Sequence, residues 1–143
     1  MGEAREVMDR VTDAVVRGDE EALTALYALD AVAETPDQGT IRGRDAIAAY
    51  LAEFGVAFPD ATYEPLHKHE ADGTAIYEGY FVGTNTGPMT GPNGETIPGT
   101  GKRVRARECD AATVENGVVT SHRFYYDMMN WLEQLGLAAQ SHA

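Results

Sequence analysis

The sequence predicts an α+β domain in which helices come first, a long antiparallel meander follows, and a short helix closes the fold. Two observations carry this prediction. Hydrophobic residues recur at helical spacing up to about residue 57, and the period changes to two from Ala61 onward. A chain of 143 residues has the size of one domain, so we expect residues 1–143 to form a single domain.

Three helices are expected in the first part of the chain. Apolar residues at helical spacing predict a helix over residues 3–17, which Gly18 ends. Asp19 is placed to cap a short second helix that carries Leu23, Leu26 and Tyr27. Residues 31–35 predict a brief strand, and a third amphipathic helix follows it and runs to about Ala57.

The rest of the chain reads as strands and one helix. Turn signals at "ADG" and "ENG" separate runs of alternating polarity. The expected strands span residues 62–70, 74–86, 102–114 and 118–126. The final helix is expected over 128–136, with Trp131 and Leu135 on one face and Asp127 as its N-cap.

Charge and cysteine content exclude several classes of partner. The net charge of −12 opposes binding to phosphate backbones or anionic lipid, so neither nucleic acid nor a membrane surface is an expected partner. No apolar run approaches the ~20 residues that span a bilayer, and the N-terminus does not resemble a signal peptide. Cys109 is the only cysteine, which permits a reducing compartment. We therefore expect a cytoplasmic protein.

Two other motifs do not indicate the sites they resemble. The glycine-rich segment 83–102 ends in Gly-Lys, but Thr96 and Arg103 stand where the phosphate-binding loop needs a glycine and a Ser or Thr. A flexible hairpin loop over one mouth of the sheet, placed as a lid, is the better interpretation. His67 and His69 lack a third ligand at matching spacing, so no metal site is expected.

The most informative segment is the hairpin at 102–126. In its first strand the odd positions carry a stripe of arginines, which must face solvent or a partner, so the even positions point inward. These even positions include Glu108 and Asp110. In the second strand the even set includes His122 and Phe124. Two carboxylates and an imidazole are therefore expected on one inward face.

The turn of this hairpin decides which residues are paired. A two-residue Asn116-Gly117 turn would pair Asp110 with Arg123. A three-residue loop over 115–117 would pair Asp110 with His122 and Glu108 with Phe124. We favour the longer loop because it places both even faces on one side of the sheet. Carboxylates beside an imidazole in apolar surroundings form a candidate general acid/base site.

Seven short motifs follow one another along the chain: "VVRGDEEALTALYALDAV", "IRGRDAIAAYL", "GTNTG", "TGKRV", "VENGVV", "HRFYYD" and "QLGL". In this order they resemble the motifs of SnoaL-like polyketide cyclases, in the nuclear transport factor 2-like superfamily. The resemblance implies a cone-shaped α+β domain with a strongly curved antiparallel sheet wrapped around N-terminal helices. It also implies an apolar pocket and a homodimer, or a higher homo-oligomer, formed through the sheet face.

The resemblance also assigns positions to the family's functional residues. The acid/base aspartate of the cyclases follows "HR", and this chain has Phe124 there. Two family histidines fall at Asn85 and Asp110, and ketosteroid isomerases hold a protonated aspartate near the place of Asp110. Limonene-epoxide hydrolases need an Arg-x-Asp pair on the strand that reads "AIYEGYFV" here; because that pair is absent, epoxide hydrolysis is less favoured.

These observations lead to one hypothesis and one alternative. The hypothesis is a cofactor-independent small-molecule enzyme of the cyclase/isomerase type, in which Asp110, with His122 or Glu108, moves a proton next to a carbonyl group of an apolar or polyketide-like ligand. The alternative is a ligand-binding or accessory domain without catalysis, which Phe124 would suit. The residues expected to contact the ligand are Asn85, Phe124, Tyr126 and Tyr50.

Overall fold

A computed structural model of the chain describes residues 2–91 and 93–138, so residues 1, 92 and 139–143 of the expected domain lie outside the described residues. The helices are α1 (Glu3–Arg17), α2 (Glu20–Leu26), α3 (Arg44–Ala57) and α4 (Met128–Leu135). The strands are β1 (Tyr27–Thr35), β2 (Gly39–Arg42), β3 (Thr62–Ala71), β4 (Thr74–Thr84), β5 (Met89–Thr90), β6 (Thr96–Ile97), β7 (Arg103–Glu115) and β8 (Val118–Tyr126).

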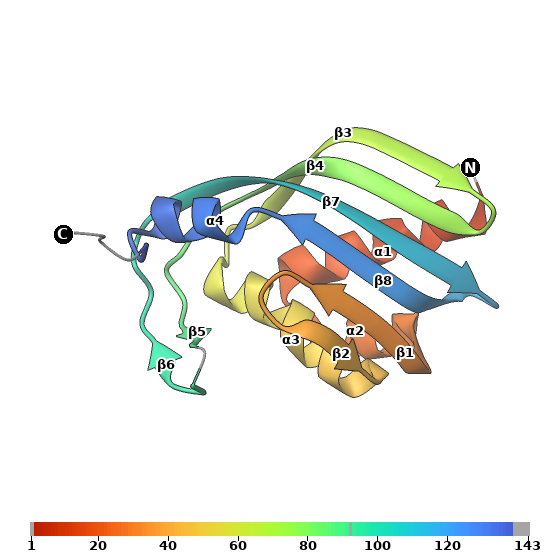
Figure 1. Cartoon of the computed structure of the whole chain (residues 1–143), viewed down its shortest axis with the longest axis horizontal. Helices are drawn as coiled ribbons and strands as arrows, with labels where there is room; N and C mark the ends of the chain where they lie inside the picture. Colours follow the sequence, from red (N-terminus) through yellow and green to blue (C-terminus); the bar gives the residue numbers. More distant parts are fainter. Residues whose placement is uncertain (1, 92, 139–143) are drawn as a thin grey trace.

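Six strands form one curved sheet in the order β2-β1-β8-β7-β4-β3, and β5 pairs with β6 separately. The long strands β4 and β7 arch over helices α1–α3, which cover one face of the sheet, while α4 lies at one end (Figure 1). The meander from β3 to β8 is antiparallel, as predicted. The sheet as a whole is mixed rather than antiparallel, because β1 pairs with β8 in parallel.

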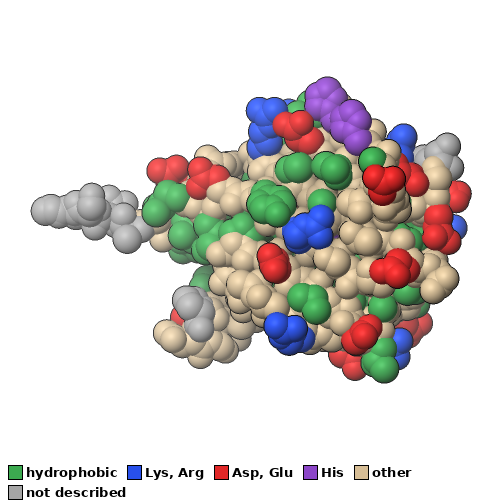
Figure 2. Space-filling model, turned by 45° about the vertical axis from the view of Figure 1, so that its right-hand side comes forward, with side chains coloured by type: hydrophobic (Ala, Val, Ile, Leu, Met, Phe, Trp, Pro, Cys, Tyr) green, Lys and Arg blue, Asp and Glu red, His purple; other side chains and the backbone are tan. Residues whose placement is uncertain are grey.

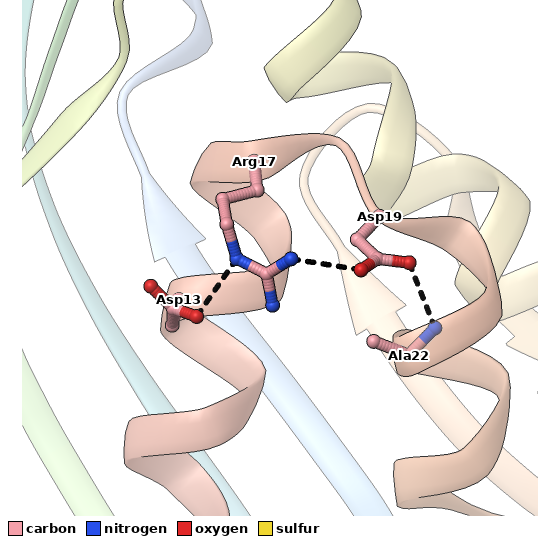
Figure 3. A network of polar contacts seen from close by, with 4 residues as sticks. All are labelled: Asp13, Arg17, Asp19 and Ala22. Atoms are coloured by element: carbon pink, nitrogen blue, oxygen red, sulfur yellow. Dashed lines mark hydrogen bonds and ion pairs between the residues drawn. The ribbon is translucent and has the colours of Figure 1, made fainter.

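The first helix begins and ends, and the second begins, where the sequence predicts. The backbone of Gly18 is left-handed (φ 64°), a conformation that costs glycine little, and its N–H bonds back to the end of α1. The Asp19 side chain accepts a hydrogen bond from Ala22 N at 3.0 Å and caps α2. Arg17 links the two helices by pairing with both Asp13 and Asp19 at 2.8 Å (Figure 3).

The core lies between the helices and the inner face of the sheet. Helix α1 packs with α3 against the sheet. Its buried face is formed by Ala4, Val7, Met8, Val11 and Ala14. Side chains at this spacing share one face of a helix, which explains why the apolar period alone located α1. A smaller apolar cluster around Phe58, Phe81 and Leu135 fixes the end of the sheet to which α4 packs.

The region between α2 and α3 contains more strand than the sequence predicted. Strand β1 begins at Tyr27, which was expected at the end of the second helix, and it extends to Thr35. Residues 39–42 were expected as a connection and form the edge strand β2. β1 has exposed positions among its buried ones, and no position of β2 is buried, so the apolar signal of both strands is weak.

The turn of the β7–β8 hairpin differs from the expected one. The predicted three-residue loop over 115–117 is wrong, because Asn116 and Gly117 alone form the turn and Glu115 pairs with Val118. Both turn residues have positive φ, 52° and 81°, as the type I′ turn that suits two-residue hairpins requires.

A β-bulge in β8 nevertheless places the expected residues on one face. Thr120 is an extra residue that has no register partner in β7, and it shifts the register by one position. Asp110 consequently pairs with Phe124, not with His122, and Glu108 likewise does not pair with Phe124. The prediction that the even positions of both strands point inward is confirmed around the site, although its reason was wrong.

The segment between β4 and β7 forms a small hairpin that extends away from the main sheet (Figure 1). Its base is held by Asn85, which is fully buried. The Asn85 side chain donates to the carbonyl oxygens of Ala57 and Gly87 and accepts from Thr100, over distances of 2.9–3.1 Å. These contacts attach both ends of the loop to the end of α3.

The outer face of the sheet carries charges of both signs, and acidic and basic side chains are interspersed over the face seen in Figure 2. Arg105 pairs with Glu64 at 3.0 Å, and Arg107 pairs with Glu78 at 2.7 Å. The predicted outward orientation of the arginine stripe is confirmed. None of the described helices is long and apolar enough to cross a membrane.

The Asp127 cap is expected to contribute to stability. Its side chain accepts a hydrogen bond from Asn130 N at 3.1 Å at the start of α4. We expect Asp127→Ala to lower the free energy of unfolding by about 1 kcal/mol, because the capped N–H loses its partner. Asp127→Ser, which can still cap the helix, should retain most of the wild-type free energy of unfolding. Urea unfolding of the three proteins checks this, and equal losses in both variants would contradict a capping role.

Candidate active site

A cavity of about 80 Å³ lies between the inner face of the sheet and helices α1, α3 and α4. Most of its wall is apolar or aromatic. It is lined by Val11, Thr12, Val15, Val16, Tyr50, Leu51, Phe54, Tyr63, Phe81, Glu108, Asp110, His122, Phe124, Tyr126 and Trp131. An apolar cavity with a few convergent polar groups is the usual form of a small-molecule site.

The two carboxyl groups of the cavity come from one strand. Glu108 and Asp110 are two positions apart on β7, so their side chains point to the same face of the sheet, inward. Two strand residues span roughly 6.5 Å, which places the carboxyl groups within reach of one small ligand. The structure therefore brings together the acid/base residues that the sequence predicted.

His122 connects Asp110 to a buried tyrosine. The Nε2 atom of His122 lies 2.6 Å from Asp110 Oδ2, and Nδ1 lies 2.6 Å from the Tyr27 hydroxyl. All three side chains are buried. Burial, and then the neighbouring Asp110 carboxylate, raise the pKa of Tyr27 well above its usual range, so its hydroxyl remains a donor.

This chain of hydrogen bonds sets the tautomer of the imidazole. An imidazole tautomer that carries its proton on Nε2 donates to Asp110 Oδ2 and accepts the Tyr27 hydroxyl proton at Nδ1, which matches both contacts. The Phe124 ring stacks on the imidazole, with centroids 3.9 Å apart, and restricts its rotation. The Asp110 carboxylate is consequently held in one orientation, with Oδ2 occupied by the imidazole.

Glu108 has a different environment from Asp110. It makes no ion pair with a described residue. Burial, and then the nearby Asp110 carboxylate, raise the pKa of Glu108 well above its usual range. A site with one carboxylate held by an imidazole and one carboxyl group that retains its proton can supply a base and an acid.

Tyr50 and Tyr126 line the cavity, and their hydroxyls bond to the exposed Asp37. The two hydroxyl oxygens are 2.9 Å apart, and both donate to Asp37 Oδ1, at 2.7 and 3.0 Å. Burial is the largest cause that raises the pKa of each hydroxyl, so both remain protonated. Asp37 belongs to the turn between β1 and β2, a connection to which sequence reasoning gave no role.

Two expectations about the surroundings of the cavity are corrected. Asn85 does not line the cavity, because all of its side-chain hydrogen bonds go to the base of the β5–β6 loop. The loop itself contributes no lining residue, so the expected lid over the mouth is not found in its described part. Phe124, Tyr126 and Tyr50 do line the cavity, where the sequence placed them.

The two exposed histidines lie away from the cavity. His67 and His69 are on β3, and their rings stack with centroids 6.0 Å apart. Histidine side chains are seen together at the surface in Figure 2. Within residues 2–91 and 93–138, no group of three His, Cys, Asp or Glu side chains is placed to hold a metal ion.

Sequence reasoning missed three residues of the site. Tyr27 was assigned to a helix, Tyr63 was an unremarked strand residue, and Trp131 was only one of several apolar residues of the last helix. Strand alternation could have found Tyr63, because it pairs with the inward Phe81. No local pattern places Tyr27 beside His122, since 95 positions separate them.

A family model described as SnoaL-like polyketide cyclase matches residues 5–135 of the chain. No curated protein matches the chain. The solved structures that resemble it share the fold at low sequence identity. A candidate SnoaL-like polyketide cyclase from Jannaschia sp. CCS1 superposes with a TM-score of 0.80 at 16% identity, covering 96% of this chain and 94% of that one.

Two other structures show the same fold. IdmH, a candidate polyketide cyclase from Streptomyces antibioticus, has a TM-score of 0.75 and 23% identity, and the match covers 94% of this chain and 99% of that one. An epoxide hydrolase from M. tuberculosis that resembles limonene-epoxide hydrolase has a TM-score of 0.69 and 20% identity, over 93% and 89% of the two chains. At these identities the likeness establishes the architecture and leaves the chemistry to the site.

The raised pKa of Glu108 predicts how stability depends on pH. The folded protein keeps a proton that the unfolded chain loses above its ordinary pKa of 4.5. Stability is therefore fully present below pH 4.5 and falls as the pH rises through the native pKa, by at most about 1.4 kcal/mol per pH unit. Glutamine does not titrate, so the free energy of unfolding of Glu108→Gln should fall less over this pH range than that of the wild type. Urea unfolding at pH 5 and pH 8 measures it.

A matched control separates this effect from the loss of any carboxylate. Glu53 is exposed on α3, and Glu53→Gln should keep the same decline between the two pH values as the wild type. Equal declines in the wild type and Glu108→Gln would contradict the raised pKa.

Proposed function

The chain belongs to the SnoaL-like polyketide cyclase family, and from this premise we propose that it catalyses proton transfer next to a carbonyl group of a small neutral substrate. One observation carries the proposal. At one end of an apolar cavity, Asp110 accepts a hydrogen bond from a buried imidazole, while the neighbouring Glu108 has a pKa raised by burial. This difference assigns the base to Asp110 and the acid to Glu108.

The proposed reaction begins when Asp110 takes a proton from the carbon next to the carbonyl group. Oδ2 is occupied by His122, so Oδ1 is the oxygen that receives this proton. The C–H electron pair becomes the C=C bond of an enol, and the carbonyl π electrons move to oxygen, which takes the proton of Glu108. For isomerisation of a conjugated substrate, Asp110 returns its proton to the far carbon of the dienol, and the enol O–H proton goes back to Glu108. For ring closure, the enol carbon attacks a second carbonyl carbon of the same molecule, whose oxygen takes the proton from Asp110 while the enol O–H proton goes back to Glu108.

His122 and Tyr27 act in this proposal as positioning residues. The imidazole holds the Asp110 carboxylate by one oxygen, and the Tyr27 hydroxyl holds the imidazole in the tautomer that donates to it. Tyr27 does not line the cavity, so it acts on the substrate only through His122. A base fixed in this way loses little entropy when the reaction begins.

The position of Phe124 bears on the choice between an enzyme and a binding domain. The resemblance places the acid/base aspartate of the cyclases at position 124, and its absence would suit a domain that only binds a ligand. Phe124, however, is the direct cross-strand partner of Asp110. A carboxylate from β7 therefore lies beside the place where one from β8 would lie, and this favours the enzyme.

The cavity restricts the substrate class. Its wall is mainly apolar, and both polar groups that reach it from β7 are acidic, which disfavours an anionic ligand. A volume of about 80 Å³ accommodates only the reacting part of a polyketide-like molecule. The remainder would extend through the mouth past Tyr50 and Tyr126. The reaction as proposed uses no cofactor.

We also propose that two copies associate through the outer face of the sheet. Ile76 of β4 is 39% exposed on this face, next to Ala111 on the neighbouring strand, and Tyr125 is 58% exposed on β8. Sedimentation velocity should give about twice the mass of the 15.4 kDa chain. Ile76→Glu should give the monomer, because a buried unpaired charge opposes association. A monomeric wild type would contradict the proposal.

Asp110→Asn tests the base. We expect this variant to slow deuterium uptake at the carbon next to the carbonyl of cyclohexanone or acetophenone, in D₂O, by about 10²–10⁴-fold, since an amide cannot take the proton. Proton NMR measures the exchange, and ligand-observed NMR measures binding, which should persist. Binding of the ketones without wild-type exchange above the buffer rate would favour the binding domain.

The control for this variant lies on the same strand. Cys109 stands between the two carboxyl residues and points to the outer face, so Cys109→Ser should exchange as the wild type does. If it slows the reaction as much as Asp110→Asn does, the effect on Asp110 belongs to the strand and not to its carboxylate.

A further inference from the structure

The Tyr63 hydroxyl is a polar group of the cavity without an assigned role. Tyr63 comes from β3 and lines the cavity together with Glu108 and Asp110. Its oxygen is buried and makes no hydrogen bond of ordinary geometry with a described residue, although the Glu108 carboxyl group lies near enough to affect its pKa. Buried hydroxyls are nearly always paired, because leaving one unpaired costs free energy. A buried, unpaired donor at a ligand cavity indicates that its partner is the ligand.

A gap in the neighbouring strand fixes the position of this hydroxyl. Gly79 of β4 lies at an inward position and is the register partner of Glu108. A Cβ atom at Gly79 would come within 2.6 Å of the Tyr63 oxygen and 2.7 Å of the ring carbon that bears it. The phenol therefore fills the space that a side chain at position 79 would take, directly beside Glu108.

We infer that Tyr63 is a further catalytic residue, whose hydroxyl donates a hydrogen bond to the substrate carbonyl oxygen beside Glu108. The inference rests on the proposed function and deepens it. Glu108 supplies the proton to the oxygen, and Tyr63 stabilises the negative charge that develops there before the proton arrives. Donors fixed in advance at such a position contribute strongly in a site without bulk water.

The groups around the phenol are consistent with a donor role. Burial raises the pKa of Tyr63 most, and the Glu108 and Asp110 carboxyl groups raise it further, so the hydroxyl keeps its proton. Among the described residues that line the cavity, no lysine or arginine is present that could neutralise an oxyanion. Hydroxyl and carboxyl donors are therefore the groups available for this task.

Tyr63→Phe tests the inference, because it removes only the oxygen atom, which makes no hydrogen bond of ordinary geometry to the protein. The melting temperature should stay the same or rise, whereas ketone exchange should slow by about 10²-fold. Tyr80→Phe is the matched control, since Tyr80 is on β4 with its ring against Arg105 on the outer face. It should exchange at the wild-type rate.

A second measurement does not depend on turnover. The infrared stretching band of the carbonyl group of cyclohexanone bound to the wild-type protein should shift to lower frequency than in hexane, and Tyr63→Phe should reverse part of this shift. Wild-type exchange that Tyr63→Phe leaves unchanged would overturn the inference and leave the proposed function standing. A carbonyl shift that depends on Tyr63, without deuterium exchange by the wild type, would support Tyr63 as a hydrogen-bond donor and overturn its catalytic role. A melting temperature lowered by several degrees, or no bound ketone, would also overturn it.

Discussion

The site depends on one extra residue in β8. Side chains alternate between the two faces of a strand, so an insertion of one residue exchanges the faces of everything beyond it. Thr120 is this insertion, and it follows a two-residue turn that alone would have paired Asp110 with Arg123. Because of the bulge, His122 and Phe124 point into the cavity on the same side as Asp110. Without it, the carboxyl groups of β7 would face the interior beside an arginine.

The polar groups of the cavity are tolerated because most of them are connected. Burying a carboxylate costs free energy unless it is paired, and Asp110 is paired through His122 to Tyr27. Glu108 has no such chain, and burial favours its neutral form instead. The two neighbouring carboxyl groups are thus stabilised differently: Asp110 is hydrogen-bonded, and Glu108 keeps its proton. That difference is also what acid/base catalysis requires.

Sequence reasoning succeeded where the signal is local. The period of α1, the cap at Asp19 and the alternation of β7 each lie within a few neighbouring residues, and all three are present in the structure. It failed where distant segments decide. Tyr27 joins a strand because β1 pairs with β8, and the register depends on a bulge that no turn residue announces. Inward residues could thus be predicted, but their pairing could not.

The cavity is small, so the contacts of Tyr50 and Tyr126 at its edge bear on how a larger substrate enters. About 80 Å³ is less than the 150 Å³ of an engineered cavity that holds benzene, so a ring-sized substrate needs movement of the wall. The hydrogen bonds of Tyr50 and Tyr126 to Asp37 join α3, β8 and the β1–β2 turn at this edge. Asp37 is exposed, so water can replace the protein at these bonds at little cost. The carboxyl groups, in contrast, are on the long central strand β7. Opening at the mouth can therefore admit a larger substrate without disturbing the acid and the base.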